Sequence, residues 1–133
     1  METANHECYV SLEVAKLLKK AGFDWEVNHS YPNCESLDNS CSGYMEDLSF
    51  YHNLNDGKYG GMSAPTLDVA QRWLREKWDL IITIEYNYHE NAFICKVYSK
   101  VECLSILFDF FTYEEAQEAG IKKALEIILD NEN

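Results

Sequence analysis

The chain has 133 residues, of which 47% are hydrophobic and 14% aromatic, with only 2 prolines and 6 glycines. This length suits a single domain over residues 1–133, and the composition argues against a disordered tail, a collagen or a coiled-coil rod. The 23 acidic and 11 basic residues leave a formal net charge of −12. Because a surface of that sign repels phosphate backbones, we expect no direct binding of nucleic acid.

The N-terminal residues and the apolar runs predict a cytoplasmic protein. Residues 1–8 are acidic and polar, with no basic stretch followed by an apolar run, so they do not resemble a signal peptide. The longest apolar runs, at 81–84 and 104–111, fall far short of the ~20 residues that cross a bilayer. We therefore expect no membrane partner.

The 5 cysteines are an odd number for a chain expected in a reducing compartment, which predicts free thiols rather than disulfides. Cys95 and Cys103 lie inside apolar runs and are predicted to be buried. If a disulfide does form, Cys34 and Cys41 are the pair to expect. These two, even with His29 nearby, lack the closely spaced ligands of a structural zinc site, so we predict no metal site.

The first two predicted helices have clear start signals. Ser11 can cap an apolar stripe over residues 12–21, and Gly22 can end that helix in the left-handed conformation. Thr66, directly after a proline, can cap a second helix with its apolar stripe over residues 67–78.

A third helix is predicted at the C-terminus. Thr112 and Glu115 have the spacing of a capping box, and the helical pattern continues to about Leu129. Small residues recur on one side of this helix, which would let it lie close against a sheet: Ala116, Gly120 and Ala124.

The remaining segments predict strands. Between the first two helices, 25–27 and 48–51 are each short enough for a strand, with loop-forming residues between them. The alternating segments 80–88 and 92–99 predict a hairpin, and 104–111 is apolar enough for a central strand buried on both faces. This order predicts an α+β two-layer domain, in which a mostly antiparallel sheet of about 4–5 strands packs with three helices. The aromatic residues expected mainly in the core are Trp25, Trp73, Phe93, Phe108 and Phe110.

Three blocks of the sequence resemble a family of small, uncharacterised proteins found in phages and prophages of gut Bacteroidetes. The blocks are Val10–Phe23, Ser63–Glu76 and Phe111–Leu125, and they follow the family's order over a span from near one end of the chain to near the other. The resemblance implies a context rather than an activity, namely an accessory phage gene whose product acts in the host cell cytoplasm, often against host defences.

The motifs of common enzymes are missing from the sequence. It contains no Gly-x-Ser-x-Gly elbow, no recognised catalytic cysteine context and no glycine motif for phosphate binding. The acidic pair Glu114-Glu115 lies at a predicted helix N-terminus, where the helix dipole explains it. We therefore expect no catalytic residues, no cofactor and no enzymatic activity.

A small-ligand site is predicted at the loop that leads to the second helix. In the glycine-rich segment 57–61, Lys58 would supply charge and Tyr59 a stacking face. Thr66 lies at the N-terminus of the helix, where backbone amides can bind an anion, and Arg75 adds a cation further along. The same loop is also what an ordinary turn into a helix looks like.

Two tyrosines complete the predicted site. The alternation along 80–88 places Tyr86 and Tyr88 on the apolar side of their strand. There they would either pack in the core or line a pocket or interface, because tyrosine combines apolar area with a hydrogen-bonding group.

These features favour a non-catalytic binding protein, for which two functions remain open. In the first, the protein counters host anti-phage defence by sequestering a nucleotide immune signal, as a homo-oligomer with sites between protomers. In the second, it is an acidic inhibitor that imitates nucleic acid and binds a basic host protein, a role that the net charge of −12 would favour through electrostatic steering.

Overall fold

The computed structural model describes residues 8–32 and 44–131, so Cys34 and Cys41, the pair to expect only if a disulfide forms, lie outside the described residues. The helices and strands follow one another along the chain as α1 (Leu12–Lys20), β1 (Val27–Pro32), β2 (Glu46–His52), β3 (Gly61–Ser63), α2 (Leu67–Trp78), β4 (Ile81–Asn87), β5 (Ala92–Tyr98), β6 (Cys103–Phe110) and α3 (Tyr113–Asn131).

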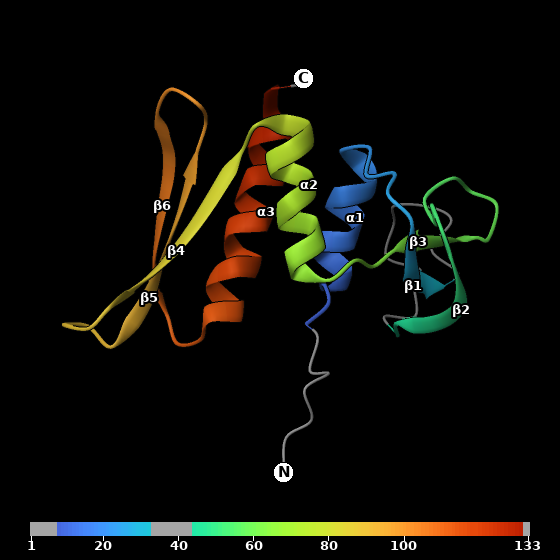
Figure 1. The fold of residues 1–133 in the computed structure, drawn as a ribbon, viewed down its shortest axis with the longest axis horizontal. Coiled ribbons are helices and arrows are strands. Elements are labelled where there is room, and N and C mark those ends of the chain that lie inside the picture. The colour runs from blue at the N-terminus through green and yellow to red at the C-terminus, as the bar shows by residue number, and fades with distance from the viewer. Residues whose placement is uncertain (1–7, 33–43, 132–133) are drawn as a thin grey trace, which may run out of the picture.

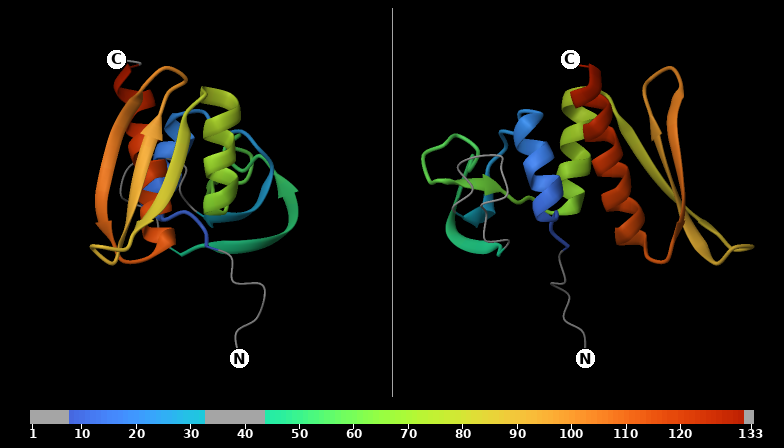
Figure 2. Two further views of the ribbon diagram at one scale, coloured as in Figure 1. Left: turned by 60° about the vertical axis from the view of Figure 1, so that its left-hand side comes forward. Right: turned by 180° about the vertical axis from the view of Figure 1, so that it is seen from behind.

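Within the described residues, three helices lie between two antiparallel sheets of three strands each (Figure 1). The N-terminal sheet has the order β2-β1-β3 and the C-terminal sheet the order β4-β5-β6. Helix α3 packs against all three strands of the C-terminal sheet and against both other helices, while α1 contacts β3. The view from behind shows the same sequence of sheet, helices and sheet (Figure 2).

The α+β class and the three helices are therefore confirmed, whereas the single sheet of 4–5 strands in two layers is wrong. Six strands in the described part of the chain divide into two sheets because α2 carries the chain from one side of the helical layer to the other (Figure 1). Strand β3, which is only three residues long, was not predicted.

The predicted helix caps are all present. Ser11 Oγ accepts a hydrogen bond from the backbone N–H of Val14 (3.3 Å), and Thr66 Oγ1 accepts one from Val69 (3.2 Å). At the start of α3, Thr112 Oγ1 accepts from the N–H of Glu115 (3.1 Å). Each cap satisfies a donor that the helix itself leaves unpaired, which explains why these residues start the helices.

The small residues of α3 bring that helix close to the C-terminal sheet. Ala116, Gly120 and Ala124 are fully or almost fully buried, and a Cβ atom placed on Gly120 would lie 2.3 Å from Cys95 Sγ. The predicted close approach is thus confirmed. Burial raises the pKa of the Cys95 thiol to about 11, so this cysteine stays protonated at neutral pH.

Strand β6 differs from its prediction. It is an edge strand rather than a central one, since it follows β5 at the end of the sheet order. Its outward side chains are exposed because α3 packs against only one face of this sheet, and Phe108, predicted to lie in the core, is 59% exposed. Cys103, predicted to be buried, is exposed as well.

In the part of the chain that the structure describes, no helix has the length and apolar character needed to cross a membrane.

Candidate functional site

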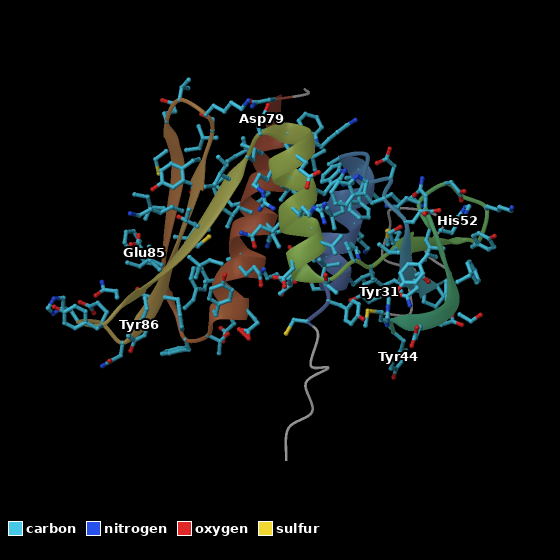
Figure 3. The ribbon with its side chains drawn as sticks, in the orientation of Figure 1. Tyr31, Tyr44, His52, Asp79, Glu85 and Tyr86 are labelled. Atoms are coloured by element: carbon cyan, nitrogen blue, oxygen red, sulfur yellow. The ribbon has the colours of Figure 1, made fainter. Side chains whose placement is uncertain are left out.

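The structure does not gather the six predicted ligand-binding residues into one site. Lys58 and Tyr59 lie on the turn between β2 and β3, and the Tyr59 ring contacts His52, which is labelled in Figure 3. Thr66 caps α2, and Arg75 lies nine residues further along that helix, or about 13 Å away. Tyr86 lies near the end of β4 in the other sheet (Figure 3), and Tyr88 follows directly after that strand.

The turn between β2 and β3 carries an aromatic cluster, which we call the turn cluster: Phe50, His52, Asp56, Lys58 and Tyr59. The Tyr59 ring lies 5.2 Å from Phe50 and 4.9 Å from His52, and Lys58 Nζ is 5.6 Å from the Tyr59 ring centroid. The backbone N–H of Lys58 donates to Asp56 Oδ1 (2.8 Å), and this bond, followed by the contact with His52, lowers the pKa of the Asp56 carboxyl. The cluster thus combines an exposed ring with one cation and one carboxylate.

The N-terminus of α2 is already supplied with acceptors. Thr66 is engaged as the cap, and the backbone N–H of Leu67 donates to the carbonyl of Cys8 (2.8 Å). Asp68 lies in the first turn and accepts a hydrogen bond from Gln117 Nε2 (2.6 Å). A cavity of about 280 Å³ next to this end is lined by Asp68 and by Glu114. An anion bound there would meet two carboxylates, so the geometry does not favour the phosphate site that the sequence suggested.

The outer face of the C-terminal sheet, which points away from α3, carries a groove of about 390 Å³. We call it the sheet-face groove, and it is lined by Glu85, Tyr86, Asn87, Tyr88, Ile94, Lys96, Ile106 and Phe108. It therefore contains both predicted tyrosines, together with apolar residues that the sequence placed elsewhere.

The strand register explains why apolar side chains reach this face. Glu85 pairs with Ile94, and Lys96 pairs with Ile106, so these four residues point to the same side. Their neighbours along the strands, such as Cys95, point the other way into the core beneath α3. A sheet face exposed to water is normally polar, yet here Ile106 is 46% exposed.

The two charged groups of the groove pair with each other, and the Tyr86 hydroxyl has a partner outside the groove lining. Lys96 Nζ lies 2.8 Å from Glu85 Oε1, and this contact raises the pKa of the Lys96 ammonium group. Tyr86 donates its hydroxyl hydrogen to Asn91 Oδ1 (3.1 Å), while its ring packs on Phe93 at 5.1 Å. These pairings leave a surface that offers apolar contacts around a single internal ion pair.

Sequence reasoning missed Ile106 and Phe108 as surface residues. Reading 104–111 as a strand buried on both faces assigned both of them to the core. No local signal separates the two cases, because an apolar strand has the same residue pattern whether its second face is covered or open. Within residues 8–32 and 44–131, no group of three or more His, Cys, Asp or Glu side chains is placed to hold a metal ion.

The fold and the groove together define an α+β protein with a helical layer between two sheets and an apolar outer face on one of them. A scan against protein-family models found no match, and comparisons with curated proteins and with solved structures found none either.

Proposed function

We propose that the chain is a non-catalytic binding protein that binds a protein partner through the sheet-face groove. The observation that carries this proposal is the apolar character of an outward-facing sheet surface at Ile94, Ile106 and Phe108. Aliphatic and aromatic side chains gathered on an exposed face are typical of protein interfaces, where their burial supplies the binding energy.

The charge of the molecule favours a basic partner. Besides Glu85, the sheet carries the exposed carboxylates of Glu90, Glu102 and Asp109 at or near its two ends, against Lys96 and Lys100. Together with the net charge of −12, these groups would steer a basic protein toward the groove. In the phage context that the sequence resemblance implies, the partner would be a basic host protein that this chain inhibits.

The test compares two exposed aromatic residues on different sheets. The full-length protein is used to capture proteins from a bacterial lysate, and the captured protein is purified so that its affinity can be measured. We expect Phe108→Ala to raise the dissociation constant at least about tenfold, because aromatic residues in a groove often dominate an interface. Tyr51→Ala is the matched control, since Tyr51 is 67% exposed against 59% for Phe108 but lies on β2.

Two further results decide this proposal. A basic partner should bind more weakly as the salt concentration rises, because screening weakens charge steering and contacts at the rim. Equal affinities for the Phe108→Ala and Tyr51→Ala variants would show that the groove is not the binding surface.

A second candidate function is sequestration of a nucleotide signal by the turn cluster. The observation that favours it is the exposed Tyr59 ring with Lys58 beside it, because a base can stack on an aromatic ring while a lysine contacts its phosphate. The test is a thermal-shift screen with linear and cyclic nucleotides. A ligand at about a hundred times its dissociation constant adds ~2.7 kcal/mol of stability, which raises the melting temperature by several degrees.

Two variants show which surface of the protein causes any such rise in the melting temperature. Tyr59→Ala should abolish the response to the nucleotide, whereas Tyr88→Ala, at an exposed tyrosine of the other sheet, should leave it unchanged. A screen without any shift would reject tight nucleotide binding by this protein.

A further inference from the structure

The outer edge of β6 is an open strand edge. Strand β6 (Cys103–Phe110) is the last strand of the order β4-β5-β6, and in the described parts of the chain β5 is the only strand paired with it. Figure 2 shows β6 at the margin of its sheet. The opposite edge differs, because α2 lies against β4 and Gln71 Nε2 donates to the carbonyl of Ile82 (3.0 Å).

Edge strands usually carry features that prevent pairing with another chain, such as lysine, proline or several charges. Strand β6 contains no lysine and no proline, and Asp109 is its only charged residue. The pairing of β6 with β5 is irregular near both ends of β6, opposite Val97 and Tyr98 of β5 and opposite Phe93 and Cys95 of β5. Between these two places, Ser105–Leu107 pair with β5 in regular register. The centre of this edge is therefore regular, uncharged and unprotected.

We propose that a second copy of this chain pairs with this edge, so that two β6 strands run antiparallel across a two-fold axis. An interface of this kind is self-complementary, because the same strand supplies both sides. Directly opposite residues in an antiparallel pair must point to the same face. In a symmetric pair, this condition holds only when one residue lies opposite its own copy, with the two-fold axis between them. At the centre of β6, that residue is Ile106 or Leu107.

Either position brings apolar side chains together on the outer face. With the axis at Ile106, this residue meets its own copy, and with the axis at Leu107 it meets Phe108 of the second copy. Cross-strand apolar pairs of this kind stabilise a sheet. Both side chains are exposed in the single chain, so pairing would remove apolar surface from water.

The charge distribution selects this edge over other surfaces for a second copy. A chain with a net charge of −12 repels its own copy over most of its surface. In the proposed pairing the two Asp109 carboxylates lie on opposite sides of the axis, about 14–20 Å apart along the strands, which is beyond the Debye length in physiological salt. The nearest carboxylates of different copies are Asp109 and the exposed Glu102 that precedes β6. They are offset by one residue along the strands with the axis at Ile106 and by three residues, or about 10 Å, with the axis at Leu107. Charge repulsion therefore favours the axis at Leu107.

The product is a continuous six-stranded sheet in which both sheet-face grooves stay on the same outer face. The proposal does not rest on the proposed function, because it concerns the backbone edge of β6, although Ile106 and Phe108 both line the groove and lie at the proposed contact. The pairing would give the expected homo-oligomer a specific contact, namely backbone hydrogen bonds between two β6 strands.

Sedimentation equilibrium on the full-length protein tests the pairing. We expect a dimer for the unchanged chain and a dissociation constant at least about tenfold higher for Ile106→Lys, because the new ammonium groups face each other or lie on a diagonal across the axis. Ile81→Lys is the matched control: Ile81 is 39% exposed against 46% for Ile106 and shares the outer face, but it lies on β4. This variant should dimerise like the unchanged chain.

The alternatives give different results. A protein that stays monomeric at every concentration overturns the pairing, and it leaves the proposed function in place if the groove still binds its partner. Equal weakening by Ile81→Lys and Ile106→Lys would indicate contact between sheet faces and also overturns it.

Amide hydrogen exchange on the unchanged chain tests the same pairing without any variant. In the dimer, β6 amides that point away from β5 should be protected, and they should exchange faster when dilution dissociates the dimer. Rapid exchange of these amides at all concentrations contradicts the proposal, even if Ile106→Lys fails to fold.

Discussion

Replacing Gly120 with alanine is expected to lower the free energy of unfolding by about 1–3 kcal/mol, the usual cost of overfilling a packed core. The sign of this change in the free energy of unfolding is informative, because replacing glycine with alanine at an exposed position inside a helix stabilises the helix by about 1 kcal/mol. At Gly120 the new methyl group would lie 2.3 Å from Cys95 Sγ and 2.8 Å from Ile82 Cγ2. Helix α3 would have to move away from the sheet, or both neighbours would have to shift.

A double-mutant cycle with Cys95→Ala tests this explanation. Removing Sγ takes away the closest contact, so Gly120→Ala should cost less in the Cys95→Ala background than in the unchanged chain. The measurement is urea denaturation followed by circular dichroism, with the free energies compared at unchanged slope. A Gly120→Ala variant as stable as the unchanged chain would show that α3 does not lie this close to β4 and β5.

Local features of the sequence were sufficient to predict the helices. The capping hydroxyls of Ser11, Thr66 and Thr112 all accept the hydrogen bonds expected of them. A cap and a 3.6-residue period act within one or two turns of chain, so both can be read without knowledge of the tertiary structure. The small-residue side of α3 was readable for the same reason.

The arrangement of the sheets depends on contacts far apart in the sequence. Strand β3 (Gly61–Ser63) is too short to show a two-residue period, and it becomes a strand only by pairing with β1. The hairpin of β4 and β5 has a short turn and was predicted correctly, with ends that agree to within one residue. The packing of α1, α2 and α3 between the two sheets decides which sheet each strand joins.

The candidate site was harder to predict because an apolar strand has two explanations. The segment 104–111 fits a strand buried on both faces, and it fits equally an edge strand with an apolar outer face. Tyr86 illustrates the same limit: it lies on the predicted side of β4, yet it is half exposed at the end of the sheet. Residue type indicates a preference for burial, while the layers packed on each face of a sheet determine whether burial occurs.

Replacing Trp73 with alanine is expected to remove about 3–5 kcal/mol of stability, the typical loss for a large buried aromatic residue. Trp73 is fully buried on α2, where its ring lies 5.4 Å from Phe23 in an edge-to-face arrangement and 6.5 Å from Trp78. It thus joins the loop after α1 to the middle of the helical layer. Since small domains are stable by about 5–15 kcal/mol, the variant loses a large share of its stability.

The phenylalanine variant separates ring packing from the hydrogen-bonding group of the indole. Trp73→Phe keeps an aromatic ring, leaves a smaller cavity, and removes an N–H for which no acceptor lies within hydrogen-bond distance among the described residues. We therefore expect a loss of only about 1–2 kcal/mol. Urea denaturation followed by circular dichroism measures both variants, with Tyr88→Ala as the exposed aromatic control, which should stay within about 0.5 kcal/mol of the unchanged chain. Similar losses for alanine and phenylalanine would show that the indole N–H is bonded in solution and that this bond, rather than the ring contact with Phe23, holds α2 in place.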